Sequence, residues 1–326
     1  MTAATTMRNP ELDVQITGMR LEAAGVISLE LQTPDRSPLP AWTAGSHVDL
    51  VLPSGLTRQY SLCGDIDDTL RLRIAVLLVP TGRGGSREVH SGLRLGQTVT
   101  IRGPRNAFEL QPADSFLFVA GGIGITPILP MIRAVQKANA KWHLMYGGRS
   151  RASMAFIPEL QRTGGGNVEI LPADEVGLLD LDSVVARAAA GAQVYSCGPG
   201  ALLDALTARF AAADLSDSLH IERFGAAPVA SGTTDSKAGS LRVILARSGA
   251  TVDVPSDCSV MSALRDAGHC VPSSCEQGIC GMCETRVLDG VPDHRDSLLT
   301  ESERERSDTM MVCVSRARSP TITLDL

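Results

Sequence analysis

The sequence predicts a multidomain fold: an antiparallel β-barrel, an α/β domain with a parallel sheet, and a small C-terminal domain. The chain has 326 residues, which is enough for two or three domains. Near residue 112 the pattern changes from alternating strands to strands that alternate with helices. Most of the eight cysteines lie near the C-terminus. We therefore place domains at 1–112, 113–225 and 240–326, with a linker over 226–239.

The first domain is predicted from short strands in which hydrophobic and polar residues alternate. Examples are His47–Leu52, Leu70–Ile74 and Thr98–Ile101. Period-two alternation places one face of each strand against a core. Frequent glycine and proline turns between such strands favour an antiparallel barrel.

The second domain is predicted from strands that lead into helices. Ser115–Ala120 is an apolar run followed by glycines and a helical pattern. Gln193–Ser196 is likewise followed by glycines and a helical pattern. Trp142–Tyr146 is a further strand-like run. Alternation of strand and helix predicts a parallel sheet. The segment 226–239 is small, polar and aperiodic, which is the composition of a flexible tether.

The composition is that of a globular protein, with 44% hydrophobic and 20% charged residues. A net charge of −6 argues against nucleic acid as a partner. No apolar run is long enough to span a membrane, and the first residues lack the hydrophobic segment of a secretory signal. We therefore expect no nucleic-acid or membrane partner, and a cytoplasmic location in which thiols stay reduced.

The cysteines of the third domain have the spacing C-x4-C-x2-C followed by one distant cysteine, which is the plant-type spacing for a [2Fe–2S] cluster. The four are Cys275, Cys280, Cys283 and Cys313. Gly278 and Gly281 suit a loop that curls around a small inorganic core, because glycine tolerates positive φ. Cys313 lies in the apolar run 310–314, where we expect a strand to carry the fourth ligand.

Three other interpretations of these cysteines stay open. Disulfides would need an oxidising compartment, for which no signal peptide is visible. Structural zinc sites usually have two C-x2-4-C pairs rather than three ligands in one loop. Ordinary buried thiols seldom cluster in this way. We expect Cys63, Cys258 and Cys270, which fall outside the spacing, to be packed thiols.

Two segments of the first domain predict a phosphate site. Arg58 begins the stretch Arg-Gln-Tyr-Ser-Leu, and its planar fork of donors suits a phosphate. We expect Tyr60 to face away from Arg58 and to cover an aromatic ring. The loop Gly82–Ser86 offers successive backbone N–H groups as an anion nest. Taken alone, the first segment also fits an ordinary strand, and the second fits an exposed turn.

The second domain contains two glycine turns that follow predicted strands. In the first, the glycines let a pyrophosphate approach a helix N-terminus. We expect Thr126 to be the N-cap and Pro127 the first helical residue, with Pro130 still in the first turn. The third glycine of G-x-G-x-x-G is absent. The second turn contains Cys197, which in isolation also fits a buried thiol at a strand end.

Together these segments resemble the phthalate dioxygenase reductase family, over nearly the whole chain. The matching motifs are R-x-Y-S-L from Arg58, G-R-G-G-S from Gly82, G-G-x-G-I-T-P from Gly121, C-G-P-G from Cys197 and the cysteine loop. Vanillate O-demethylase reductases look similar. The resemblance implies a β-grasp ferredoxin domain over 240–326 and a first domain that binds FMN.

The resemblance also implies roles for individual residues. Arg58 and Ser86 would hold the flavin phosphate, and Cys197, the one catalytic candidate, would lie near the nicotinamide. Phe224, in isolation a plain core residue, would pack against the flavin. The implied flavin residues are Arg58, Tyr60, Ser61, Leu62, Ile74, Ala75, Val76, Gly84, Gly85 and Ser86. The implied nucleotide residues are Gly121, Gly122, Gly124, Thr126, Arg149, Cys197, Gly198, Pro199 and Phe224.

The choice between NADH and NADPH depends on the turn Gly147–Arg151. A free ribose favours an acid there, and a 2′-phosphate favours Arg or Lys. The turn contains Arg149 and Arg151 and no acid. Because reductases of the resembled type mostly use NADH, we expect NADH, with NADPH as the alternative.

The resemblance implies an NAD(P)H-dependent oxidoreductase that passes electrons from NADH through FMN to the [2Fe–2S] cluster. The acceptor would be the Rieske non-haem iron component of an oxygenase or O-demethylase, docked transiently at the ferredoxin domain. The alternatives are a redox sensor, a reductase for another acceptor such as a cytochrome P450, and a zinc-stabilised flavoenzyme. The acid-rich segment 293–308 is either a solvated face or a docking surface.

Overall fold

The computed structural model describes residues 11–164, 167–224, 241–273, 275–278, 281–296, 298–299 and 301–326. The chain forms two compact units. The first ends at Glu222, and the second begins at Arg223. The predicted linker 226–239 lies outside the described residues, and the predicted domain boundaries stay predictions. Within the described ranges, no helix has both the length and the apolar character needed to cross a bilayer.

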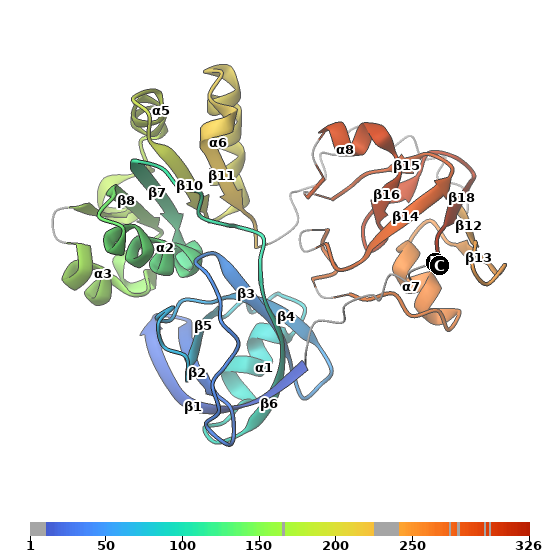
Figure 1. Cartoon of the computed structure of the whole chain (residues 1–326), viewed down its shortest axis with the longest axis horizontal. Helices are drawn as coiled ribbons and strands as arrows, with labels where there is room; N and C mark the ends of the chain where they lie inside the picture. Colours follow the sequence, from blue (N-terminus) through green and yellow to red (C-terminus); the bar gives the residue numbers. More distant parts are fainter. Residues whose placement is uncertain are drawn as a thin grey trace. The chain divides into compact units, whose positions relative to one another are not determined.

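The first unit begins with a curled antiparallel sheet (Figure 1). Its strands are β1 (Glu11–Ala23), β2 (Val26–Gln32), β3 (Ser46–Val51), β4 (Thr57–Ser61), β5 (Leu72–Leu77) and β6 (Thr98–Asn106), in the order β4-β3-β6-β1-β2-β5. The two edges meet just after β4, where Leu62 forms a bridge with Ile74. Alternate residues such as Val14 and Leu50 fill the core. The helix α1 (Gly85–Ser91) lies between β5 and β6 in sequence.

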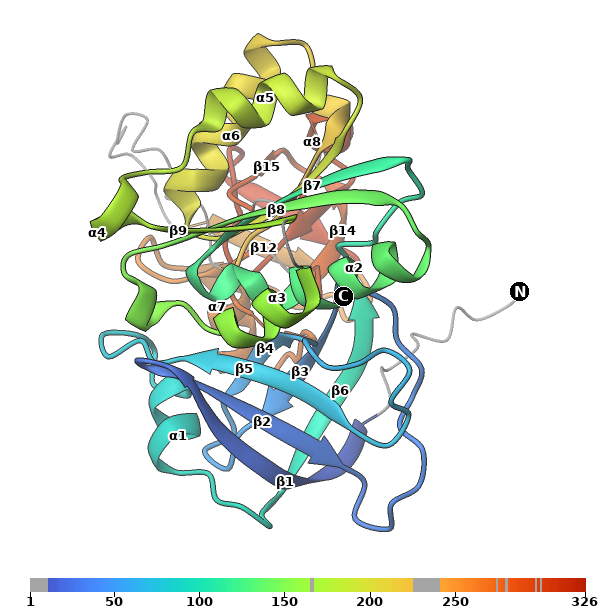
Figure 2. The same cartoon turned by 90° about the vertical axis from the view of Figure 1, so that its left-hand side faces the viewer.

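A parallel sheet forms the second part of this unit. Its strands are β7 (Ser115–Gly121), β8 (Lys141–Gly148), β9 (Val168–Pro172), β10 (Gln193–Cys197) and β11 (Leu219–Glu222), in the order β11-β10-β7-β8-β9. The helices are α2 (Ile125–Lys137), α3 (Ile157–Gly164), α4 (Ala173–Val176), α5 (Leu181–Ala189) and α6 (Gly200–Ala212). Figure 2 shows α5 and α6 on one side of the sheet, and α2 and α3 on the side that faces the barrel.

The barrel and the parallel sheet share a hydrophobic core. Ala44 and Ala75 of the barrel pack in the same cluster as Phe118 and Ile128. The chain runs from β7 to β8 and β9 on one side, then returns to β10 and β11 on the other, so β7 and β10 flank a switch point. In open α/β sheets, ligands bind at such a point, beyond the carboxyl ends of the strands.

The second unit is built on a mixed sheet. Its main strands are β12 (Leu241–Leu245), β13 (Thr251–Val254), β14 (Glu284–Asp289), β16 (Thr309–Met311) and β18 (Thr321–Leu324), in the order β13-β12-β18-β14-β16. The remaining elements are α7 (Val260–Asp266), β15 (Pro292–Asp293), α8 (Glu301–Arg306) and β17 (Arg316–Ala317). Ser259 caps α7, and Leu264 packs into the sheet core. With the barrel and the parallel sheet, this unit confirms the predicted fold class.

Candidate cofactor and metal sites

Arg58 lies against the glycine loop that the sequence associates with it. Its Nη2 donates to the carbonyl oxygen of Arg83, 3.0 Å away. A Cβ atom on Gly85 would stand 2.6 Å from Cγ and 2.7 Å from Nε of Arg58, so a larger residue there would displace the arginine side chain. Gly84 has φ +89, which glycine adopts without strain. A guanidinium against a glycine loop fits the binding of a phosphate group.

The hydroxyl of Ser86 is engaged inside this loop. Its Oγ accepts a hydrogen bond from the backbone N–H of Val79 at 3.0 Å. This bond fixes the loop to the end of β5, and the contact between Ser86 and a phosphate stays a prediction.

Strand β4 presents Arg58 and Tyr60 on one face and Ser61 on the other. In the register with β3, Arg58 lies opposite Leu50 and Tyr60 lies opposite Val48. The expectation that Tyr60 faces away from Arg58 is therefore wrong, because residues two apart in a regular strand share a face. Burial raises the pKa of Tyr60 to about 12, so its phenol stays protonated.

The other implied flavin residues lie in hydrophobic cores. Leu62, Ile74 and Val76 pack in the barrel core, and Ala75 packs in the core shared with the parallel sheet. Because these side chains are buried against protein, the parts available to a flavin ring are those of the main chain. Their role stays a prediction.

The two glycine turns of the parallel sheet meet backbone to backbone. A Cβ on Gly124 would stand 2.2 Å from the carbonyl oxygen of Cys197. A Cβ on Gly121 would stand 2.6 Å from Cδ of Pro199, and one on Gly198 would stand 3.0 Å from Cα of Gly121. The glycines therefore permit close packing at the switch point between β7 and β10, which is where a pyrophosphate would approach α2.

Helix α2 begins earlier than the sequence predicts. Its N-cap is Gly124, and a 3-10 turn over Gly122–Gly124 precedes it. Thr126 is the second helical residue, and its hydroxyl donates to a carbonyl of that turn at 3.0 Å. The expected N-cap role of Thr126 is wrong, because the turn continues directly into the helix. Pro127 is accordingly the third helical residue, and Pro130 lies in the second turn of the helix.

Cys197 ends β10 and is fully buried beside Ala120 of β7. Burial raises the pKa of its thiol well above the ordinary value, and the nearby Glu222 raises it further. The thiol is therefore protonated and neutral, and it is not a thiolate nucleophile.

Glu222 is a functional candidate that the sequence reasoning missed. It lies opposite Cys197 in the register of β10 and β11. Ser61 Oγ donates to its Oε2 at 3.3 Å, which connects the carboxyl to the end of β4. Desolvation raises the pKa of Glu222 to about 8, although the bond from Ser61 acts to lower it. The available sequence signal is an acid inside a strand that ends beside a predicted site.

The turn after β8 contacts two residues of helix α4, one through an ion pair and one through a backbone hydrogen bond. Arg151 donates through Nε and Nη2 to the two carboxylate oxygens of Glu175, at 3.1 and 2.9 Å. Asp174 donates its backbone N–H to the carbonyl oxygen of Arg149 at 3.2 Å. The acid that the turn itself lacks thus comes from α4, the helix that follows β9, while the side chain of Arg149 is exposed.

Phe224 follows β11 and has an exposed side chain. It is therefore not the plain core residue that its sequence suggests in isolation. Its contact with a flavin stays a prediction.

Three of the four predicted cluster ligands are described, and all three are buried: Cys275, Cys283 and Cys313. Cys280 lies outside the described residues. The backbone N–H of Gln277 donates to the sulfur of Cys275 at 3.3 Å. Amide donors to sulfur fit an iron–sulfur site.

The cysteine loop has the predicted tight backbone. Gly278 and Gly281 have φ +68 and +74. A Cβ on Gly278 would stand 2.6 Å from Cγ2 of Val314. Cys313 lies in a turn two residues beyond β16, so the expected strand ends before the ligand. Among the described residues no three donors gather around a single metal ion, whereas a [2Fe–2S] cluster spreads four cysteines over two irons.

The cysteines outside the spacing differ in exposure. Cys63 is buried, Cys258 is partly buried and Cys270 is exposed. The expectation of a packed thiol is therefore wrong for Cys270, which lies in the irregular segment between α7 and the cysteine loop.

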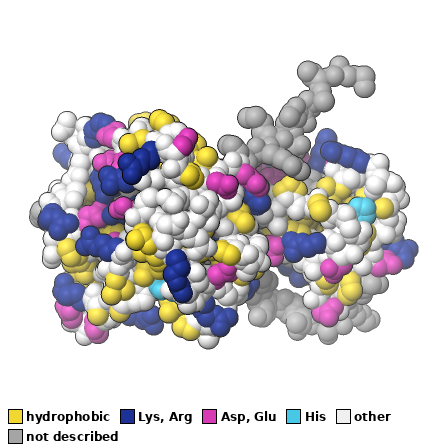
Figure 3. Space-filling view, turned by 90° about the horizontal axis from the view of Figure 1, so that it is seen from below, with side chains coloured by type: hydrophobic (Ala, Val, Ile, Leu, Met, Phe, Trp, Pro, Cys, Tyr) yellow, Lys and Arg dark blue, Asp and Glu magenta, His cyan; other side chains and the backbone are white. Residues whose placement is uncertain are grey.

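Two acids of the segment 293–308 are engaged in local contacts. Asp293 pairs with Arg295 at 2.7 Å. The buried Asp296 accepts backbone N–H groups from the two residues at 298 and 299, at 3.1 and 2.8 Å. Figure 3 shows Lys and Arg side chains interspersed with acidic ones on the surface. These contacts favour a solvated face over a docking patch of a single sign.

Two family models match separate parts of the chain. An oxidoreductase NAD-binding domain matches residues 118–171, and a 2Fe-2S iron-sulfur cluster binding domain matches residues 243–318. The chain is thus a modular oxidoreductase in which a nucleotide-binding domain precedes an iron–sulfur domain.

Similarity to known proteins extends over the whole length. Phenoxybenzoate dioxygenase subunit beta of Ectopseudomonas oleovorans is 41% identical, with 100% of both chains covered. The solved structure of phthalate dioxygenase reductase, described as a modular structure for electron transfer from pyridine nucleotides to [2Fe-2S], is 36% identical, with a TM-score of 0.73 over 97% of this chain and 98% of that one. The chain belongs to the phthalate dioxygenase reductase family.

A larger protein contains a similar region. The crystal structure of an intact type IV self-sufficient cytochrome P450 monooxygenase is 42% identical over 100% of this chain, with a TM-score of 0.83. This chain spans 43% of that protein.

Proposed function

We propose that this chain is the reductase component of an oxygenase system, taking electron pairs from NADH and delivering single electrons to a partner protein. The observation that carries the proposal is that Glu222 lies next to both the predicted flavin site and the predicted nicotinamide site. This residue contacts Ser61 at the end of β4 and lies opposite Cys197 at the second glycine turn. A flavin held at β4 and a nicotinamide held at the glycine turns would therefore be neighbours.

The residues of the first unit fit FMN. When bound, FMN would accept a hydride and return its electrons one at a time. Arg58 and the loop at Gly85 provide a cation and backbone donors for its single phosphate. Ser61 provides a hydroxyl at the end of β4, and Cys197 is a neutral, buried thiol on the nucleotide side.

The ion pair at the ribose turn favours NADH over NADPH. The guanidinium of Arg151 is already engaged by Glu175 through two hydrogen bonds. A 2′-phosphate would have to compete with that carboxylate and would meet the charge of Asp174 as well. A free ribose hydroxyl meets neither obstacle.

The acceptor that we propose is the Rieske-type component of an oxygenase or O-demethylase. A relative that covers the whole chain is named as a dioxygenase subunit. The cysteine loop of the second unit would hold the cluster that passes on each electron, and we propose that the partner docks transiently there. Asp293 and Asp296 are engaged in local contacts, so we propose that recognition rests on the loop itself.

A cytochrome P450 is the second candidate acceptor. The specific observation in its favour is the match over the full length of this chain to a self-sufficient P450 monooxygenase. Turnover with a purified Rieske oxygenase and with a P450, each supplied with NADH and this chain, distinguishes the two.

The test of the electron route uses one ligand and one matched cysteine. In Cys283→Ser, NADH should still bleach the flavin absorbance, but reduction of cytochrome c should be lost, because the cluster is missing. Cys270→Ser removes an exposed cysteine outside the spacing and should leave both reactions unchanged. Cytochrome c reduction at the normal rate by Cys283→Ser would contradict the proposed route.

A further inference from the structure

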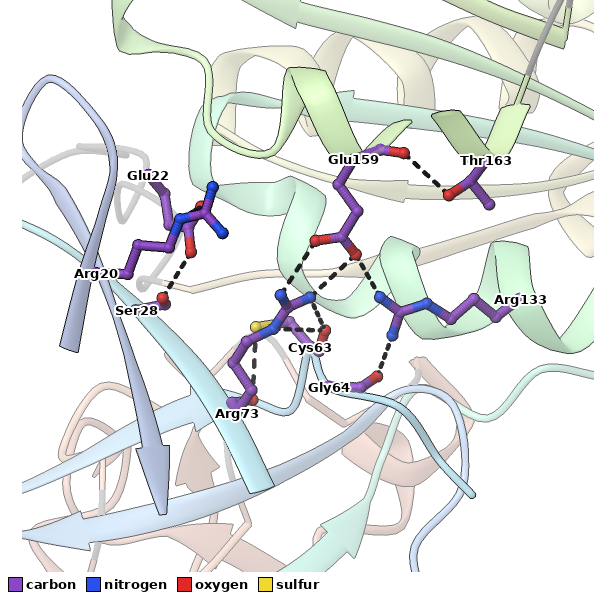
Figure 4. Close-up of polar contacts among 9 residues, drawn as sticks. All are labelled: Arg20, Glu22, Ser28, Cys63, Gly64, Arg73, Arg133, Glu159 and Thr163. Atoms are coloured by element: carbon purple, nitrogen blue, oxygen red, sulfur yellow. Dashed lines mark hydrogen bonds and ion pairs between the residues drawn. The ribbon is translucent and has the colours of Figure 1, made fainter. Parts of the chain in front are cut away.

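A cluster of three charged side chains crosses the boundary between the barrel and the nucleotide domain. Figure 4 shows Glu159 of α3 between Arg73 of β5 and Arg133 of α2. Nη1 and Nη2 of Arg73 donate to the two carboxylate oxygens of Glu159, at 3.0 and 3.1 Å. Nη2 of Arg133 donates to Oε1 of the same carboxylate. One carboxylate thus links β5 of the barrel to two helices of the nucleotide domain.

The same two arginines also bind the main chain that follows the flavin strand. Nη2 of Arg73 donates to the carbonyl oxygen of Cys63 at 2.7 Å, and Arg133 Nη1 donates to the carbonyl oxygen of Gly64. These carbonyls lie two and three residues beyond Ser61. The cluster therefore fixes the end of the strand that carries the flavin site.

Burial and charge make this cluster more than a surface pair. The side chains of Arg73, Glu159 and Arg133 are only 20%, 22% and 29% exposed. Desolvation alone would raise the pKa of Glu159, but the hydrogen bonds and charges of the two arginines outweigh it and lower that pKa. Bidentate pairing between a guanidinium and a carboxylate fixes direction as well as distance.

The start of α3 is held in an unusual conformation beside the cluster. Phe156 has φ +63, a region that bulky residues seldom adopt, and its ring is buried. The guanidinium of Arg73 lies over that ring, 5.0 Å from its centroid. A strained residue that persists is over-determined by its surroundings. Here the surroundings orient the helix that presents Glu159.

We propose that Glu159 is a positioning residue that sets the distance between the nicotinamide and the flavin. Helix α2 carries the glycine turn at its N-terminus and Arg133 further along, so the carboxylate couples the nucleotide site to the flavin strand. Hydride transfer is sensitive to small displacements between donor and acceptor. This inference rests on the proposed function as an NADH-dependent flavin reductase.

A second ion pair across the same boundary provides the matched control. Lys137 of α2 pairs with Asp67 of the barrel at 2.9 Å, but these side chains are 73% and 70% exposed. Pairs of this kind contribute little, because solvent screens them and long side chains lose entropy. Asp67→Asn therefore removes an acid at the same boundary without touching the buried cluster.

The test compares Glu159→Gln with Asp67→Asn in the full-length protein loaded with its flavin. In Glu159→Gln, the rate of flavin reduction at saturating NADH should fall by about tenfold or more, because the reacting atoms are no longer held at the productive distance. The long-wavelength absorbance produced by stacking of nicotinamide on flavin should fall with it. The dissociation constant of NADH should change by less than about twofold, and Asp67→Asn should match the wild type throughout.

Two results would overturn the proposal. The first is a Glu159→Gln protein with a lowered melting temperature but a normal reduction rate and normal stacking absorbance, which would make the cluster purely structural. The second is an equal loss of rate in Asp67→Asn. If Glu159→Gln does not fold, Arg133→Gln keeps the Arg73 pair and should show an intermediate loss of rate, whereas a normal rate overturns the proposal. A wild-type protein whose flavin NADH does not bleach would instead overturn the proposed function.

Discussion

At the scale of single residues, the ionisation of Glu222 links stability to pH. Its pKa is raised from 4.5 to about 8 because the carboxyl is desolvated. Between these two values the folded state keeps a proton that the unfolded state has released. Stability therefore falls with rising pH in this window. The contribution is fully present below about pH 4.5, the unfolded value, and is lost as the pH rises through about 8.

We predict that Glu222→Gln removes this pH dependence, because glutamine does not titrate. The stability of the variant relative to the wild type should rise by up to about 1.4 kcal/mol per pH unit between about pH 5 and 8. Urea denaturation at several pH values measures the difference. Parallel stability curves for the two proteins across that window would show that the wild-type carboxyl is already ionised.

The pair of Arg151 and Glu175 is the residue-scale basis for nucleotide preference. In Glu175→Gln the arginine is released, so the affinity for NADP⁺ relative to NAD⁺ should rise about two- to fivefold, as expected for one exposed charge. Titration calorimetry with both nucleotides measures the ratio. Asp182→Asn, which breaks a more exposed pair with Arg209 in the same domain, should leave the ratio unchanged. An unchanged ratio in Glu175→Gln would remove this pair from the ribose site.

At the scale of elements, the switch point is a place where two turns touch through their backbones. Gly124 has ordinary helical dihedral angles, so space rather than conformation requires glycine there. The loop from β7 into α2 and the loop from β10 into α6 therefore depend on each other for their shape.

We predict that Gly124→Ala destabilises the protein by about 1–3 kcal/mol, as expected for overpacking, because the new Cβ would lie 2.2 Å from the carbonyl oxygen of Cys197. NADH binding should weaken in the same variant. Thermal unfolding and NADH titration measure the two effects. Gly18→Ala is the control, since its Cβ meets only the flexible side chain of Glu30. Equal stability of the two variants would mean that the turns separate easily.

At the scale of the whole molecule, the chain divides into a unit for the nucleotide and flavin and a unit for the cluster. The hydrophobic cores of the first unit contain residues up to Leu219, and that of the second unit contains residues from Leu241 onward. Loss of the cluster in Cys283→Ser should therefore leave the first unit folded. This independence is why that variant separates flavin reduction from electron export.

The fold was predictable where the signal is local. Period-two alternation in His47–Leu52 and the strand-to-glycine pattern at Ser115–Ala120 predict elements that the structure contains. The boundaries were less predictable, as the start of α2 shows. A glycine turn that passes straight into a helix looks in sequence like a loop followed by a threonine cap.

The parts of the site that could not be predicted depend on contacts between distant segments. Glu222 and Ser61 are far apart in sequence, and nothing local to either indicates the other. The same holds for Glu159, Arg73 and Arg133, because each alone looks like a solvated charge. Short motifs give the chemistry of a site, while the tertiary fold decides which charges are buried together.

The two arginines beside Glu159 hold the strand after Ser61 by its peptide oxygens, at Cys63 and Gly64. Every amino acid has such an oxygen, so mutation of Cys63 to another small residue would leave these hydrogen bonds from the arginines unchanged. Covariation between positions 63 and 73 would accordingly be weak, and surveys of aligned sequences would overlook a coupling that only coordinates reveal. Engineering that transplants this strand into another reductase must carry the arginines along, even though no side chain on the strand requires them.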